Sequence, residues 1–263
     1  MTDLTPLDHA HAGMEAAPDT AAARMRFYER LADGELFLLL EAEAQGDTIQ
    51  PRLFDLESGT FALVFDRQDR LVEFTAGVAP YVALSGRAIA HLFAGQGIGL
   101  GVNLGVAPSS ILLPDASVDW LVDTLAQRPA MVEARPTGFA APQGLPQAVL
   151  DGLDAKLAAA TGLAICAYLV SATYDTGAKG HLLAFVGADA GAQDPLAGAV
   201  AEALTFSGIE AGALDVAFFA ADDAIVAHLD RAGLRFDLPQ PEVPRRAEPV
   251  APGSDPDKPP RLR

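Results

Sequence analysis

The stretch GIGLGVNLGVAPSSILLP, residues 97–114, decides how the first half of this chain is interpreted. It holds the densest glycine in the chain, then an Asn, a Pro and two Ser, and it ends in the apolar run 111–113. Apolar residues flank it closely on both sides, which predicts a strand, a tight loop and a second strand in the middle of a domain. We expect its glycines to provide positive φ angles or close backbone packing.

A nucleotide-binding loop is an alternative interpretation of these glycines. The dinucleotide fingerprint requires G-x-G-x-x-G between a strand and a helix. Here three residues separate Gly101 from Gly105, and an apolar run follows in place of a helix. The Gly-Lys-Ser/Thr ending of a phosphate-binding loop is also missing. The sequence therefore disfavours phosphate binding by this stretch.

The polar loop within this stretch is the candidate binding surface, because loops positioned by a rigid sheet often carry binding residues. The surface comprises Asn103, Gly105, Pro108, Ser109 and Trp120. An alternative stays open for three of them. Asn103 and Ser109 could satisfy backbone groups of a turn, and Trp120 could lie in the core of its domain.

The periodicity of the chain predicts an α/β fold of the α+β type, with two small mixed-sheet domains and packed helices. The first domain is expected over residues 20–127 and the second over 145–238, joined by a proline-rich linker at 128–144. The second has the element order helix, strand, strand, helix, strand, helix, which is ferredoxin-like. Residues 1–19 and 239–263 lack apolar periodicity, so we expect both ends to be disordered.

Local signals place several individual elements. The continuous apolar run 35–41 predicts a central strand, and a short strand is possible at 131–134 within the linker. Asp194 followed by Pro195 predicts the start of a helix, and Asp222 is expected to cap the last helix.

The composition restricts the class of partner. The formal net charge is −17, and the tail from Pro239 onward is close to neutral, so the acidity lies on the folded part. An acidic surface repels phosphate backbones and anionic lipids, which argues against nucleic acid and membranes as partners. The alternative reading of this acidity is that it keeps the protein soluble.

The sequence offers no recognisable catalytic or metal-binding device. The one cysteine, Cys166, lies in an apolar run without a neighbouring base, so we expect a small core residue. The histidines lack a second ligand at metal spacing, so we expect no metal and no cofactor. The N-terminus lacks a secretory h-region, and no apolar run reaches membrane-spanning length, so we expect a cytoplasmic protein.

Four blocks of the first half resemble a known family. They are FYERLADGELFLLLE at 27–41, FALVFDRQDRLVEFTAG at 61–77, SGRAIAHLFAGQGIGLGVNLGVAPSSILLP at 85–114 and DASVDWL at 115–121. In this order they resemble the N-terminal domain of SseB family proteins, small bacterial cytoplasmic proteins named for enhanced serine sensitivity. The type III secretion protein that shares this name is distinct from them.

The resemblance covers about residues 24–127. The second half, about 145–237, has the place and pattern of the family's C-terminal domain without a strong motif. Because the family name records a phenotype, the resemblance implies fold, compartment and organisation but no catalytic residues. It implies a non-enzymatic module that binds an unknown protein or a small metabolite. Two alternatives remain: an enzyme acting on an amino-acid-related metabolite, and a structural partner subunit without a small ligand.

Overall fold

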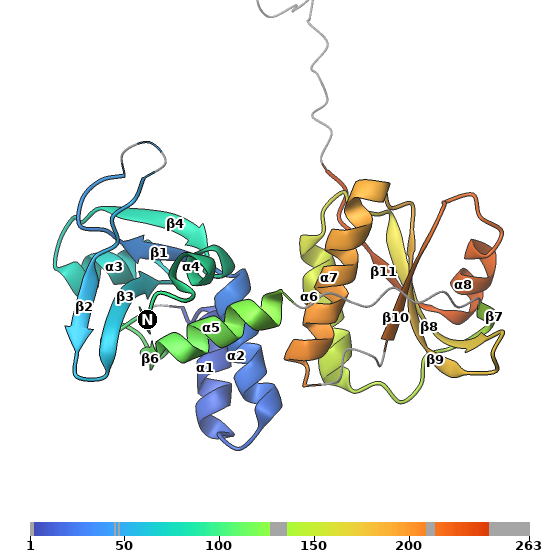
Figure 1. Ribbon diagram of the computed structural model, residues 1–263. Coiled ribbons are helices and arrows are strands. Elements are labelled where there is room, and N and C mark those ends of the chain that lie inside the picture. The colour runs from blue at the N-terminus through green and yellow to red at the C-terminus, as the bar shows by residue number, and fades with distance from the viewer. Residues whose placement is uncertain (1–2, 45, 47, 127–135, 209–213, 242–263) are drawn as a thin grey trace, which may run out of the picture.

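The computed structural model describes residues 3–44, 46, 48–126, 136–208 and 214–241 (Figure 1). It contains two small α/β domains, each with a mixed sheet and packed helices, which confirms the predicted fold class. Within these described ranges, no helix is both long and apolar enough to cross a membrane.

The N-terminal domain contains a six-stranded sheet and five helices among its described residues. In chain order these are α1 (Pro6–Ala16), α2 (Ala21–Asp33), β1 (Glu35–Leu39), β2 (Leu53–Leu56), β3 (Gly59–Phe65), α3 (Gln68–Thr75), β4 (Tyr81–Ser85), α4 (Gly86–Phe93), β5 (Ile98–Val102), β6 (Ile111–Leu113) and α5 (Asp115–Leu125). The strand order is β4-β1-β3-β5-β6, and β2 pairs with β3. Only the β3–β5 pair is parallel among these pairings.

The glycine-rich stretch forms the predicted strand, loop and strand. β5 and β6 are antiparallel, with Leu100 opposite Leu113. A Cβ atom added at Gly99 would clash with the backbone carbonyl oxygen of Leu113 on the neighbouring strand. Glycine is therefore needed there for close packing, as the sequence predicted. Gly105 has φ +71°, so the loop also uses a conformation that other residues rarely adopt.

Both faces of this sheet are covered. Helices α1, α2, α4 and α5 pack over one face, while α3 and the β5–β6 loop cover part of the other. Along β1, Leu36 and Leu38 face the first layer, and Phe37 and Leu39 face the second. Side chains of a strand alternate between faces, so a strand buried on both sides must be apolar throughout. This explains the uninterrupted apolar run 36–40 within the predicted strand 35–41.

The C-terminal domain has a five-stranded sheet between two layers of helices (Figure 1). Its elements are β7 (Pro136–Ala140), α6 (Gln147–Ala159), β8 (Cys166–Tyr174), β9 (Lys179–Val186), α7 (Ala190–Phe206), β10 (Leu214–Phe219), α8 (Val226–Ala232) and β11 (Leu234–Asp237). The order is β10-β9-β8-β11, with β7 also paired to β8. Helices α6 and α7 cover the face that carries Ala167 and Leu169, and α8 covers the face that carries Tyr168 and Val170.

The two domains meet through helices. α2 and α5 of the first domain contact α7 of the second. Phe206, the last residue of α7, is 2% exposed and belongs to the core cluster of the N-terminal domain. Apolar burial therefore joins the domains in addition to polar contacts.

The prediction of disorder over residues 1–19 is wrong for most of that segment, because α1 occupies Pro6–Ala16. Thr5 and Asp8 form a capping box, in which each side chain accepts a hydrogen bond from the backbone N–H of the other. Leu7 and Ala10 are buried in the domain core. A capping box and a proline in the first turn favour a helix start, and tertiary burial stabilises the rest.

Other boundaries also differ from the predictions. β7 begins at Pro136, so part of the expected linker 128–144 belongs to the second sheet; the possible strand at 131–134 lies outside the described residues. α7 begins at Ala190 after the N-cap Asp189, and Pro195 lies inside the helix instead of opening it. α8 has Ile225 at its N-cap position, and Asp223, rather than Asp222, accepts a hydrogen bond from the Ile225 backbone N–H.

β11 extends the predicted element order of the second domain at its C-terminal end. Most of the expected disordered tail at 239–263 lies outside the described residues.

Candidate functional site

The predicted binding loop turns inward in the structure. Asn103 and Ser109 are both 0% exposed, so they offer no surface to a partner. The Asn103 side chain accepts a hydrogen bond from the Asp66 backbone N–H at 3.1 Å and donates one to the Ser109 hydroxyl at 2.8 Å. Asn103 also has φ +48°, in the left-handed region that Asn tolerates better than most residues. The alternative reading, in which these residues satisfy the turn, is the one the structure supports.

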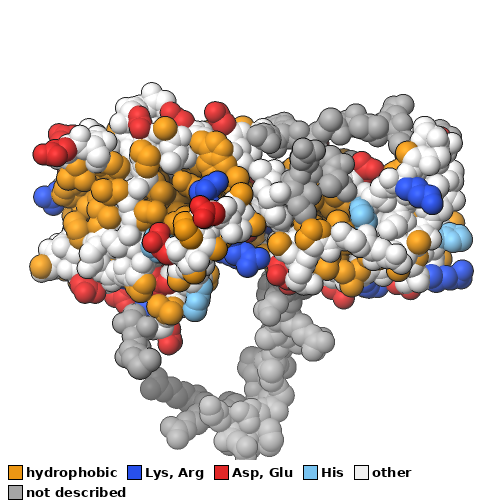
Figure 2. All heavy atoms as spheres, turned by 90° about the horizontal axis from the view of Figure 1, so that it is seen from below, with side chains coloured by type: hydrophobic (Ala, Val, Ile, Leu, Met, Phe, Trp, Pro, Cys, Tyr) orange, Lys and Arg blue, Asp and Glu red, His pale blue; other side chains and the backbone are white. Residues whose placement is uncertain are grey.

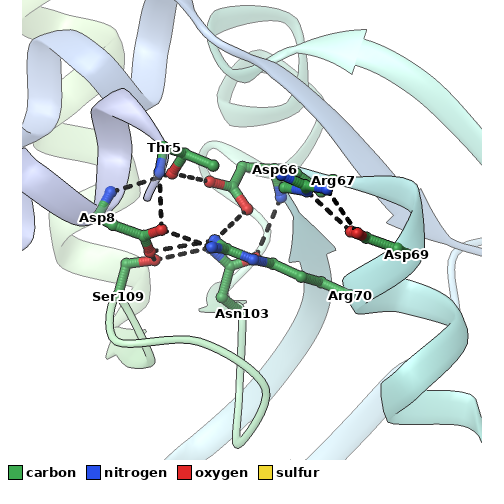
Figure 3. A network of polar contacts seen from close by, with 8 residues as sticks. All are labelled: Thr5, Asp8, Asp66, Arg67, Asp69, Arg70, Asn103 and Ser109. Carbon is green, nitrogen blue, oxygen red and sulfur yellow. Dashed lines mark hydrogen bonds and ion pairs between the residues drawn. The ribbon is translucent and has the colours of Figure 1, made fainter. Parts of the chain in front are cut away.

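Asn103 and Ser109 belong to a buried polar network around Arg70 (Figure 3). The Ser109 hydroxyl donates to Asp8 Oδ1 at 2.6 Å, and Arg70 donates to Asp8 and to Asp66. Burial alone would raise the pKa of Asp8, but the hydrogen bonds from Arg70 and Ser109 outweigh it and lower that pKa below its usual range. The network holds α1 against α3 and the β5–β6 loop, and its hydrogen-bonding groups are occupied by one another.

The other predicted surface residues do not assemble into a site. Gly105 and Pro108 are exposed on the loop. Trp120 is 36% exposed on α5 and packs edge-on against Tyr28 of α2, with ring centroids 4.9 Å apart. Trp120 is therefore partly exposed and does not lie in the core of its domain. It contacts α2 and is not part of the network around Arg70.

A different feature, a pocket between the two domains, offers a better candidate site. Its volume is about 530 Å³, within the range of small-molecule pockets. α1 and α2 line it from the N-terminal domain, and α6 with the end of α7 lines it from the C-terminal domain. The polar lining residues are His9, Arg26, Glu29, Arg30, Asp151 and Ser207. We call this space the interdomain pocket.

Glu29 is the unusual member of this lining. It is only 6% exposed, and its Oε1 atom is buried without a hydrogen-bond partner. Oε1 is the only buried side-chain polar atom in this condition among the described residues. Burial raises the pKa of Glu29, although Lys156, Arg30 and Arg26 act in the opposite direction. An unpaired buried acceptor is costly, and because Oε1 has almost no accessible surface, other atoms of Glu29 form its part of the pocket lining.

Four charged residues next to Glu29 connect the domains. Lys156 of α6 donates to Asp33 at 2.6 Å and to Glu202 at 2.8 Å. Arg87 of α4 binds the same two carboxylates, at 2.5 Å to Asp33 and 3.1 Å to Glu202. Asp33 is on α2 and Glu202 on α7, so each carboxylate lies between a cation of its own domain and one of the other. We call these residues the ion quartet.

The remaining polar lining is partly engaged. Arg26 lies 3.8 Å from Asp151, and both side chains are about half exposed. The Ser207 hydroxyl donates to the backbone carbonyls of Ala203 at 2.6 Å and Ala148 at 3.1 Å. Ser207 thus joins the end of α7 to α6, and no general base accepts its proton in this arrangement.

The N-terminal domain also displays hydrophobic side chains on its surface (Figure 2). A shallow groove of about 230 Å³ on this domain is apolar apart from Gln96. Its apolar lining residues are Ile49, Pro51, Leu53, Leu92, Phe93 and Ile98. Gln96 is the one polar side chain of this lining, whereas six polar residues line the interdomain pocket.

Cys166 occupies the position that the sequence predicted. It is 3% exposed and packs in the core between the second sheet and α8. Burial raises the pKa of its thiol, which is the opposite of what a nucleophilic thiolate requires. Within the described part of the chain, no group of three or more His, Cys, Asp or Glu residues could hold a metal ion.

Sequence reasoning missed Glu29 because nothing in the local pattern distinguishes it from a solvated charge. It lies on α2 among Arg26, Arg30 and Asp33, and the spacing of these charges predicts the polar side of a surface helix. The charges of this helix face are visible in the sequence, but the domain that packs against the helix is not. In comparisons with known proteins, no family model, curated protein or solved structure matches this chain.

Proposed function

We propose that this chain is a bacterial, cytoplasmic, non-enzymatic binding module of the SseB type, and that a small metabolite occupies its interdomain pocket. The order of the four sequence blocks that resemble the SseB N-terminal domain supports the family. The pocket of about 530 Å³, lined by helices of both domains, supports the ligand. That pocket is the single observation that carries the proposal.

A ligand at this position would couple the two domains. The lining comes from helices of both, and Glu29 precedes Asp33 of the ion quartet by one helical turn. A molecule bound there would stabilise this domain arrangement over separated domains, because only this arrangement presents both walls. The module would thus report the concentration of its ligand through the stability of the domain interface.

A binding role fits the lining better than catalysis. The Ser207 hydroxyl donates to backbone carbonyls, and the Cys166 thiol is buried in another core. The alternative, an enzyme acting on an amino-acid-related metabolite, requires His9 or Glu29, the lining residues that can act as a general base, to be directed at the ligand. Turnover of a bound compound, followed by mass spectrometry, would favour that alternative.

The test is a thermal-shift screen against amino acids, amines, carboxylates and nucleotides. Gly13 lines the pocket from within α1, and an added Cβ there meets nothing within 4 Å, so Gly13→Leu is designed to place its side chain in the pocket. Gly198→Leu is the matched control, since Gly198 is also helical with open space but lies outside the lining. We expect a hit that stabilises the wild type and Gly198→Leu but not Gly13→Leu. Hits that all survive Gly13→Leu, or a protein partner in place of any small-molecule hit, would contradict the proposal.

A further inference from the structure

We infer that the interdomain pocket takes a small organic carboxylate, whose oxygens accept hydrogen bonds from the guanidinium of Arg30. This inference rests on the proposed function and names the chemical class of its ligand. The contrast between the engaged and the unengaged charges of the lining carries it.

The two carboxylates of the lining do not require a cation from the pocket. Gln147 donates to Asp151 Oδ1 at 2.9 Å, and Arg26 lies 3.8 Å from Asp151 Oδ2. Glu29 is 6% exposed, and its Oε1 atom has almost no accessible surface. Asp151 therefore already has donors, and the unpaired oxygen of Glu29 is shielded from solvent.

Arg30 is the charged lining residue that lacks a partner. It is half-buried, and among the described residues no carboxylate forms an ion pair with it. Its charge lowers the pKa of Glu29 without such a pair. A guanidinium has five N–H donors and no acceptor, and its planar fork matches the two oxygens of a carboxylate. The vacant partner of this lining is therefore an acceptor.

Arg30 lies on the side of α2 that faces α1. Residues three apart share a face of a helix, so Arg30 and Phe27 lie on the same side. The Phe27 ring contacts the His11 ring of α1 edge-on, with centroids 5.7 Å apart. His9 and Gly13 bring α1 to the pocket, and the exposed His9 can donate through a ring nitrogen. The α1 side of the pocket therefore presents hydrogen-bond donors.

The size of the pocket favours an organic anion over an inorganic one. A water molecule takes up about 30 Å³ of liquid volume, whereas the pocket holds about 530 Å³. A bare inorganic anion would leave most of this space empty. Ala10, Ala22, Ala23 and Phe206 provide contacts for the apolar body of an organic carboxylate.

The net charge of the protein acts against an anionic ligand only over long distances. The charge of −17 repels anions from the surface as a whole. Physiological salt screens exposed charges that lie more than about 8 Å apart. The unpaired guanidinium of Arg30 inside the pocket therefore decides the sign of the ligand.

The test is an NMR titration in physiological salt. It follows the amide signals of Gly13 and Gly152, which line the pocket from α1 and α6, and the Nε–H signal of Arg30. The probes are butyrate, 1-butanol and butylammonium, which are similar in size but anionic, neutral and cationic. We expect butyrate to shift all three signals and to bind about tenfold more tightly than butanol, the scale of a charge-assisted hydrogen bond. Butylammonium should bind more weakly than butyrate.

Three variants complete the design. Arg30→Gln removes the charge and should weaken butyrate by about tenfold while leaving butanol unchanged. Arg30→Lys keeps the charge without the planar fork, so its loss should be intermediate. Arg24→Gln removes an exposed charge from the same helix outside the pocket and should change neither probe.

Tighter binding of butanol or butylammonium in the pocket, blocked by Gly13→Leu, would overturn the carboxylate class and leave the proposed function intact. Butyrate binding that Arg30→Gln does not weaken, or that Arg24→Gln weakens equally, would also overturn the inference. If no probe shifts any of the three signals, the inference is wrong, and the metabolite screen with Gly13→Leu judges the proposed function separately.

Discussion

Arg70 donates hydrogen bonds to both carboxylate oxygens of Asp8, although 62 positions separate the two residues in the sequence. Their side chains are 6% and 0% exposed. This pair attaches α1 to α3, and Asp66 adds a second carboxylate to the same guanidinium at 2.7 Å. The N-terminal helix is therefore an integral part of the first domain.

Replacing Arg70 by Met should destabilise the protein by about 3 kcal/mol, because two buried carboxylates lose their cation. The measurement is the free energy of unfolding from urea denaturation. The control is Arg67→Met, since the neighbouring Arg67–Asp69 pair is exposed and contributes little. Equal effects of the two substitutions would show that the buried network does not stabilise the fold.

Asn103→Ala should destabilise the fold by about 2 kcal/mol, because the Asp66 N–H loses its acceptor and the Ser109 oxygen loses the amide that donates to it. Asn103→Gly should recover part of this loss, since glycine adopts the φ of +48° without strain. Thermal melts of the three proteins should give the highest melting temperature for the wild type, a lower one for Asn103→Gly and the lowest for Asn103→Ala. A wild-type melting temperature for Asn103→Ala would mean that its side chain faces solvent after all.

Lys156→Met should lower the free energy of unfolding by about 2 kcal/mol, because Asp33 and Glu202 then depend on Arg87 alone. The loss should appear first at the domain interface, as faster hydrogen exchange in α2 and α7. Lys179→Met removes an exposed lysine from β9 and serves as the control. Uniformly faster exchange in both domains would argue against a local role for the quartet.

The raised pKa of Glu29 predicts a pH dependence with a definite sign. Its ordinary value is 4.5, and burial raises it in the folded state. A raised carboxyl pKa favours folding below pH 4.5, and that contribution is lost as the pH rises through the folded pKa. The unfolding free energy of the wild type, relative to Glu29→Gln, should therefore fall as the pH rises from 4.5.

Urea titrations at several pH values compare the two proteins. Arg26, Arg30, Asp33 and Lys156 act on the pKa of Glu29 in both directions, so the comparison with Glu29→Gln isolates the one carboxylate. Asp8 acts in the opposite sense, since its lowered pKa adds stability that is lost only below its ordinary value of 3.8. A constant difference between wild type and Glu29→Gln across this range would contradict a raised pKa.

The sequence was sufficient for the parts of the fold that local patterns determine. The apolar run at 35–41 predicted β1, and the glycines of 97–105 predicted a strand with close neighbours and a strained turn. These signals depend on residues within a few positions of one another. They therefore do not require knowledge of the tertiary structure.

The candidate site depended on contacts that no local pattern records. Ser109 reaches Asp8 across 101 positions, so a loop that looks like a polar surface becomes the wall of a buried network. Glu29 is buried on α2, a helix that packs against α1 of its own domain and α7 of the other. α1 was missed for a related reason, since its stability comes from Arg70 and the first core and not from a strong helical stripe.

The most direct test of the interdomain pocket as the ligand site is an NMR map of binding. Amide signals of the wild type are followed during addition of a panel of amines, carboxylates, amino acids and nucleotides. We expect a binding compound to shift Gly13 and Gly152 in the pocket, to leave Gly105 in the loop unchanged, and to lose this effect in Gly13→Leu. Shifts centred on Gly105 and its loop, with Gly13 and Gly152 unchanged, would contradict the account.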